Sequence, residues 1–229
     1  MRIDRFLQLN TPHSRQTVRG LMAEGRVLVD TVVVTDPRCE VGQFSRIELD
    51  QQVLQATPAK YFMLHKPAGV VSATVHDVHR TVLDLLSNDD RQGLHLAGRL
   101  DLKTTGLMLL TNDGSWSRRI TQPEKSFDKV YRVETQDPVP QQAAEVFRQG
   151  IYFSYEDITT RPARLEQTGS HTSLLTLNEG RYHQVKRMFG YFDNEVINLH
   201  RESMGQIKLD PKLEPGQYRE LTQAEIATV

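Results

Sequence analysis

Short apolar runs of strand length recur through the second part of the sequence, and most of them follow one another without a helical pattern between them. We expect strands at residues 61–64, 107–110, 130–133, 163–166, 174–177, 195–199 and 218–221. Helical patterns are expected at residues 82–86, 115–120, 141–147 and 182–189. Because the strands arrive in runs, the pattern favours an α+β domain with a mixed, largely antiparallel sheet over a doubly wound parallel one.

The first part of the sequence has another pattern, in which two helical segments precede a small sheet. Ile3, Phe6 and Leu7 recur at helical spacing, and Ser14 is suited to cap a second helix. Strands are predicted within residues 26–34, near residue 41 and at residues 47–49. This order indicates a small α/β domain.

A polar stretch separates the two patterns. Residues 51–58 show no clear hydrophobic period and end in Pro58, so we place a linker there. The chain is therefore expected to have a small domain with its linker at residues 1–57 and a larger domain at residues 58–229.

Composition excludes several classes of protein. Hydrophobic residues make up 38% and charged residues 25% of the chain, as in folded water-soluble proteins. The longest apolar run, residues 106–110, is far shorter than the roughly 18 to 20 residues of a membrane span. No secretory signal begins the sequence, and the single Cys39 forms no intramolecular disulfide, so we expect a cytoplasmic protein without membrane contact. No P-loop or dinucleotide fingerprint is present, and no nucleotide cofactor is expected.

Basic residues are concentrated locally although the net charge is −1. Residues 1–26 hold five bases against two acids, and residues 91–132 hold eight against four. Arg15 and Arg19 share a face of the expected second helix, where like charges are unfavourable unless an anion binds. We interpret this face, with Arg2 and Arg5, as a phosphate-contacting surface, and ordinary exposed arginines are the alternative.

The most informative segment is GRLDLKTTGL at residues 98–107. Asp101 precedes a Thr-Thr-Gly turn and then an apolar strand, so its carboxylate is well placed for nucleophilic or acid–base chemistry. A turn-forming aspartate that bonds its own backbone is the alternative.

Two later segments combine bases with aromatic side chains. The strand KVYRV at residues 129–133 places Lys129 and Tyr131 on one face, where Tyr131 is either core or a stacking surface. The segment EGRYHQVKRMF at residues 179–189 has three bases, and its Tyr182 and Phe189 could stack on bases or pack in the core.

His76 and His79 are the only hint of a metal site, which would suggest a metal-dependent hydrolase. They lie in an expected loop and lack a third ligand at an obvious spacing, so no metal is expected.

In their order and amino-acid sequence, the segments around Asp101, Tyr131 and residues 179–189 resemble those of pseudouridine synthases of the RsuA class, which act on ribosomal RNA. The resemblance covers most of residues 59–221. Residues 1 to about 50 resemble the S-four-type RNA-binding domain that precedes the catalytic domain in this class. One departure is Asp30-Thr31, where that domain usually has an Asn-Gly or Asp-Gly turn.

The resemblance implies an isomerisation that needs no cofactor: the glycosidic bond breaks, the base turns, and a carbon–carbon bond forms. It identifies Asp101 as the catalytic aspartate, acting either on the sugar carbon or on a sugar proton, and Lys186 as the cation that holds it ionised. It gives Tyr131 the role of stacking on the uracil and assisting proton removal. Residues expected to bind RNA are Arg99, which fills the gap left by the flipped base, and Arg2, Arg5, Arg15, Arg19, Arg181 and Arg187.

Within the class, the sequences of residues 61–67, 180–189 and 199–202 look closest to members that convert uridine 516 of small-subunit (16S) ribosomal RNA. The expected partner is therefore 16S ribosomal RNA or an assembling small subunit, and the chain is expected to be a monomer. Two alternatives stay open, a synthase for 23S ribosomal RNA and a non-catalytic assembly factor that binds ribosomal RNA.

Overall fold

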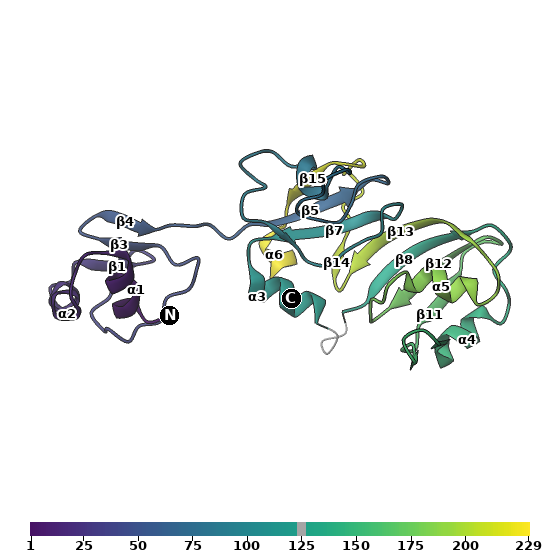
Figure 1. Ribbon diagram of the computed structural model, residues 1–229, viewed down its shortest axis with the longest axis horizontal. Helices are drawn as coiled ribbons and strands as arrows, with labels where there is room; N and C mark the ends of the chain where they lie inside the picture. The colour runs from purple at the N-terminus through teal and green to yellow at the C-terminus, as the bar shows by residue number, and fades with distance from the viewer. Residues whose placement is uncertain (123–126) are drawn as a thin grey trace. The chain divides into compact units, whose positions relative to one another are not determined.

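The computed structural model describes residues 1–122 and 127–229 and divides into two units, Met1–Ala59 and Lys60–Val229 (Figure 1). The first unit has two helices and a four-stranded antiparallel sheet of order β2-β1-β3-β4. Its elements are α1 (Ile3–Asn10), α2 (Arg15–Ala23), β1 (Val27–Val29), β2 (Val32–Val33), β3 (Ile47–Leu49) and β4 (Gln52–Gln55).

The core of the first unit is formed by the apolar stripes of both helices against one face of the sheet. Ile3, Leu7 and Val18 are fully buried in one cluster with Ile47. The Ser14 hydroxyl accepts a hydrogen bond from the Thr17 amide at 3.2 Å, which caps α2 as predicted.

The hairpin between β1 and β2 turns without glycine. Asp30 and Thr31 both have left-handed backbones, with φ of 50° and 69°, as a two-residue type I′ turn requires. Aspartate tolerates this conformation, and the Asp30 carboxylate accepts the Arg46 amide at 2.7 Å. The departure from Asn-Gly therefore leaves an ordinary tight hairpin.

Two expectations for the first unit are wrong. The expected linker at residues 51–58 contains β4, which pairs with β3. An edge strand can be largely polar, and here Gln52 and Val53 are exposed whereas Leu54 packs against the core. Val41 is buried but lies outside the strands, beside an isolated bridge between Arg2 and Glu40.

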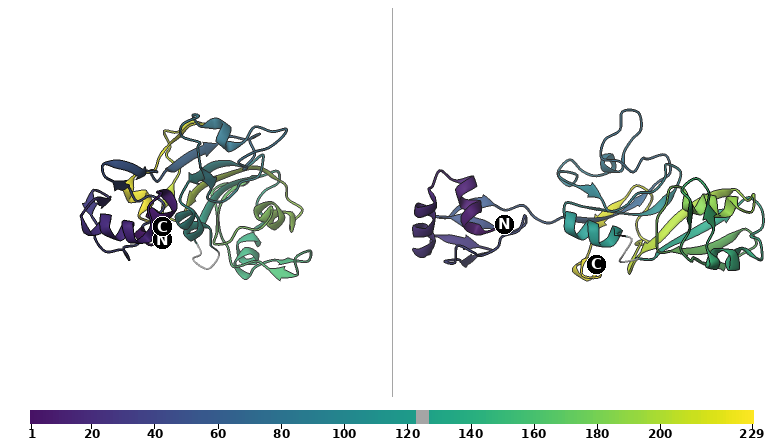
Figure 2. Two further views of the ribbon diagram at one scale, coloured as in Figure 1. Left: turned by 60° about the vertical axis from the view of Figure 1, so that its left-hand side comes forward. Right: turned by 60° about the horizontal axis from the view of Figure 1, so that its bottom comes forward.

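The second unit is built on a mixed sheet of order β11-β12-β8-β13-β7-β5-β15 (Figures 1 and 2). Its strands are β5 (Tyr61–Lys66), β6 (His95–Leu96), β7 (Thr105–Thr111), β8 (Lys129–Thr135), β9 (Tyr152–Phe153), β10 (Ile158–Thr159), β11 (Arg164–Gln167), β12 (Thr172–Leu177), β13 (Val196–Met204), β14 (Ile207–Lys208) and β15 (Tyr218–Glu220). Its helices are the 3-10 helix η1 (Val82–Leu85), α3 (Gly114–Thr121), α4 (Ala143–Gln149), α5 (Gln184–Gly190) and α6 (Gln223–Ile226).

The pairing confirms the predicted α+β class. β7 and β13 run parallel, and the other neighbours along this order are antiparallel. The short elements β6, β9, β10, β14 and α6 were not predicted, since runs of two to four residues carry little periodicity.

Alternate residues of the central strands enter two different cores. Met108 and Leu110 of β7 belong to one cluster, whereas Leu107 and Leu109 belong to another with Trp116 of α3. Successive side chains of a strand point to opposite faces, so both faces of the sheet are covered. Among the described residues, no helix is long and apolar enough to span a bilayer.

Candidate functional site

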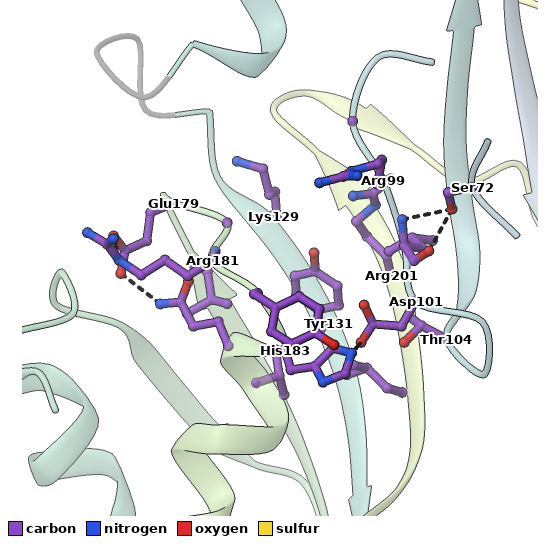
Figure 3. A pocket seen from close by; sticks show the side chains of 18 of the residues that line it. Ser72, Arg99, Asp101, Thr104, Lys129, Tyr131, Glu179, Arg181, His183 and Arg201 are labelled. Atoms are coloured by element: carbon purple, nitrogen blue, oxygen red, sulfur yellow. Dashed lines mark hydrogen bonds and ion pairs between the residues drawn. The ribbon is translucent and has the colours of Figure 1, made fainter. Parts of the chain in front are cut away.

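A cavity of about 700 Å³ opens in the second unit where segments far apart in the sequence meet (Figure 3). It is lined by the loop that precedes β7, by β8 and β13, and by the residues around the start of α5. The predicted site residues that it brings together are Arg99, Asp101, Tyr131, Arg181 and Lys186.

The backbone on both sides of Asp101 is held by two buried or half-buried side chains. The Ser72 hydroxyl donates to the Leu100 carbonyl at 2.6 Å and accepts from the Leu100 amide at 3.0 Å (Figure 3). The Lys66 ammonium donates to the carbonyls of Leu102 at 3.2 Å and Thr104 at 2.8 Å. These bonds hold the backbone of the loop from which the Asp101 side chain extends.

Lys66 is a residue that positions the Asp101 loop, and the sequence reasoning missed it. Its side chain is fully buried at the end of β5, and burial lowers its pKa to about 8 despite the opposing effect of Asp101. Its third hydrogen bond goes to the Pro67 carbonyl at 3.0 Å, so the buried amino group donates to three backbone carbonyls. A lysine that ends an apolar strand just before proline was the available signal.

The Asp101 carboxylate faces two basic side chains from α5 and its N-terminal flank. Its Oδ2 lies 3.5 Å from His183 Nε2 (Figure 3). The same oxygen lies 3.6 Å from Lys186 Nζ. The turn at Asp101 is closed by the backbone, since the Thr104 amide donates to the Asp101 carbonyl at 3.1 Å. The side chain is thus directed at a lysine and a histidine in a cavity, which is unlike the arrangement of an aspartate that merely forms a turn.

The segment before α5 is organised by a buried carboxylate. Glu179 accepts the Gln184 side-chain amide at 2.7 Å and pairs with the Arg181 guanidinium at 3.0 Å. His183 then adopts a left-handed backbone with φ of 49°, and α5 begins at Gln184, two residues after the predicted start. Sequence reasoning included His183 in the motif but gave it no role.

Three residues that line the cavity have buried polar atoms without a hydrogen-bond partner among the described residues. Arg201 is 2% exposed, and its Nε donates to the Leu107 carbonyl at 2.8 Å. The Nη2 atom of Arg201 has no hydrogen-bond partner in residues 1–122 and 127–229, and the same holds for Thr104 Oγ1 and Asn178 Oδ1. All three residues line the cavity. Because buried polar atoms are normally paired, the cavity is suited to a polar ligand. Tyr131, 9% exposed, lines the same cavity.

The arginines predicted to bind RNA fall in different surroundings. Arg99 is exposed at the cavity, whereas Arg187 is not among the cavity residues and pairs with Glu156 at 2.8 Å. The Arg187 guanidinium also lies 3.6 Å from the centre of the Phe153 ring. In the first unit Arg2 pairs with Asp4 at 2.6 Å, and Arg5, Arg15 and Arg19 are exposed. Two residues counted in the basic segment, Glu124 and Lys125, lie outside the described residues.

The stretch around His76 and His79 does not form a cluster of ligands. Their rings lie 5.0 Å apart on an exposed loop. Within the described ranges, no group of three or more His, Cys, Asp or Glu side chains could hold a metal ion.

His200 joins β13 to the start of β7 and gives a testable pH dependence. Its Nδ1 lies 2.8 Å from the Thr105 hydroxyl, and burial, with Arg132 and His65 nearby, lowers its pKa to about 4. Between pH 6.5 and 4 the unfolded chain binds a proton here that the folded chain does not, so stability falls with falling pH. We expect His200→Gln to remove about 2 kcal/mol of this acid-induced loss, measured by urea unfolding of both proteins at pH 7 and pH 4.5. Equal losses in the two proteins would contradict this prediction.

Known proteins resemble this chain over its full length. A model of the RNA pseudouridylate synthase family matches residues 60–191. The chain is 56% identical over 230 residues to ribosomal small subunit pseudouridine synthase A of Pseudomonas aeruginosa and 43% identical over 230 residues to that of Escherichia coli, with 100% of each chain covered. A crystal structure of a pseudouridylate synthase matches with a TM-score of 0.73 and 38% identity, covering 100% of this chain and 99% of that one.

Proposed function

This chain belongs to the RNA pseudouridylate synthase family, and from that premise we propose that it converts one uridine of 16S ribosomal RNA, expected at position 516, to pseudouridine. The observation that carries the proposal is the Asp101 carboxylate, held in a cavity with Lys186 Nζ at 3.6 Å. The small-subunit target is supported by the full-length relatives of that name.

In the proposed reaction Asp101 is the catalytic carboxylate. It either attacks the ribose C1′, forming an ester bond that breaks when C1′ bonds to C5, or removes a ribose proton that it later returns to the sugar. In both routes the bond from C1′ to N1 of uracil breaks. The base then turns, a bond forms from C1′ to C5, and the proton lost from C5 is balanced by one gained at N1. Lys186 offsets the negative charge of the carboxylate, and Tyr131 contacts the uracil and assists the loss of the C5 proton.

The uridine must leave its stack to reach Asp101, and the cavity is suited to receive it. The described lining residues include six lysine and arginine side chains against two acidic ones, which favours an anionic polymer. The unpartnered atoms of Thr104, Asn178 and Arg201 offer hydrogen bonds to a nucleotide. Arg99, exposed at the cavity, is assigned to fill the gap left in the RNA.

We assign the first unit to RNA binding as an S-four-like domain at residues 1–57, with residues 58–229 as the catalytic domain. Arg5, Arg15 and Arg19 are exposed on its helices and contact phosphates in this proposal. In the second unit, Arg181 and Arg187 contribute to an RNA-contacting surface around α5 in this proposal. The enzyme acts as a monomer in the cytoplasm on 16S ribosomal RNA or on an assembling small subunit.

Chemical mapping of pseudouridine tests the proposal. Small- and large-subunit ribosomal RNAs are incubated with the chain in the absence of added metal and nucleotide, and modified uridines are located by sequencing. We expect one new pseudouridine, in 16S RNA. A product in 23S RNA alone would support the alternative target, and RNA binding without any product would support an assembly factor.

A further inference from the structure

Tyr182 is an exposed aromatic side chain that the proposed reaction does not use. It is 75% exposed and lines the cavity that contains Asp101. Its ring stacks on the His183 ring, with centroids 3.9 Å apart and planes inclined by 18°. One face of the Tyr182 ring is therefore covered by His183, and the exposure of the residue leaves the other open to a ligand.

Arg187 bonds to the main chain of both residues of the stacked pair. The Arg187 amide donates to the His183 carbonyl at 3.0 Å, and Arg187 Nη1 donates to the Tyr182 carbonyl at 3.4 Å. Arg187 is itself fixed by Glu156. His183 keeps a left-handed backbone, which is unfavourable for a residue with a side chain and persists where surrounding contacts impose it.

His183, one residue of the stacked pair, also lies next to the Asp101 carboxylate. His183 Nε2 lies 3.5 Å from Asp101 Oδ2, so the covered side of the stack is connected to the catalytic carboxylate (Figure 3). Lys186, one turn along α5, contacts the same oxygen at 3.6 Å. A ligand on Tyr182 would thus lie one aromatic layer from the side chain that contacts Asp101.

We propose that Tyr182 and His183 form a stacking platform for a base of the substrate RNA that immediately flanks the target uridine. This inference rests on the proposed function. An aromatic face with cations around it suits a nucleobase on a phosphate backbone, and every base can stack on it. Flipping the target uridine leaves its neighbours without a stacking partner, and the platform supplies one beside Asp101.

The platform is tested by pairing side-chain changes with changes in the RNA. The RNA is a 16S fragment that contains the target, either intact or with one abasic nucleotide immediately 5′ or 3′ of it. Affinities are measured in the Asp101→Asn background, so that the RNA is not converted. We expect Tyr182→Ala to weaken binding of the intact RNA about tenfold, and Tyr182→Phe, which keeps the ring, to bind within about twofold of the parent.

The abasic RNAs separate stacking from a structural effect. We expect one of the two abasic RNAs to bind the parent about tenfold more weakly than the intact RNA does. Tyr182→Ala and His183→Gly should bind that abasic RNA and the intact RNA with equal affinity. Tyr155→Ala, at a tyrosine that is 95% exposed and does not line the cavity, should respond to the abasic RNAs like the parent. The platform would be overturned if the affinity losses from the side-chain change and from the abasic nucleotide were independent and additive, or if Tyr182→Ala bound the intact RNA as tightly as the parent. The proposed function would stand in that case if the wild-type chain still formed pseudouridine. No pseudouridine from the wild-type chain in either ribosomal RNA would overturn the proposed function and the platform together.

Discussion

Asp101→Asn is expected to lower the rate of pseudouridine formation by at least about 10³-fold while leaving RNA binding within a few fold of wild type. The amide keeps the shape of the side chain but can neither attack the sugar nor accept a proton from it. The backbone bonds from Ser72 to Leu100 and from Lys66 to Leu102 do not involve the changed atoms, so the loop should keep its position. Single-turnover assays at saturating enzyme, with affinity measured separately, check both parts.

Asp89→Asn is a matched control, because Asp89 is exposed and does not line the cavity. The same substitution there should leave the rate within about twofold of wild type. Turnover retained by Asp101→Asn at a tenth of the wild-type rate or more would refute a catalytic role for the carboxylate.

Elements with a strong hydrophobic period could be predicted from the sequence, and so could the family resemblance carried by the order of the motifs. The apolar run of β7 and the alternation in β8 predicted the central strands, and the resemblance indicated that Lys186 acts on Asp101. Residue spacing alone could not place these side chains together, because 85 positions separate them in the chain and only the sheet brings their segments into contact.

Other features of the site depend on partners that no local pattern reveals. From the sequence, Arg187 is expected to be an exposed base on a helix. In the structure its guanidinium pairs with Glu156, which lies in a different segment. Lys66 reads as the polar end of a strand, yet it is buried and donates to three carbonyls around the Asp101 loop. Burial and long-range pairing decide both cases, and they are properties of the folded chain.

The glycine of the Thr-Thr-Gly turn has a structural reason that the sequence did not disclose. Gly106 has φ of 105°, a backbone conformation that residues with side chains rarely adopt. It pairs with Arg201 where β7 and β13 run parallel. A Cβ placed on Gly106 would lie 2.3 Å from the Arg201 carbonyl oxygen and 2.6 Å from its amide nitrogen. Both are backbone atoms in the middle of the sheet, so neither can move aside without breaking the pairing.

Gly106→Ala is therefore expected to destabilise the second unit by about 4 kcal/mol, a large share of the stability of a typical domain. Urea unfolding monitored at Trp116, which is buried in this unit, measures the change. Gly190→Ala is the matched control, since Gly190 ends α5 and a Cβ there would have no atom within 4 Å. A helical alanine should be neutral or stabilising by up to about 1 kcal/mol. If both variants unfolded at the same urea concentration as wild type, close backbone approach would not explain Gly106. The predicted difference instead ties this glycine to the strand pairing that holds Arg201 in the cavity wall.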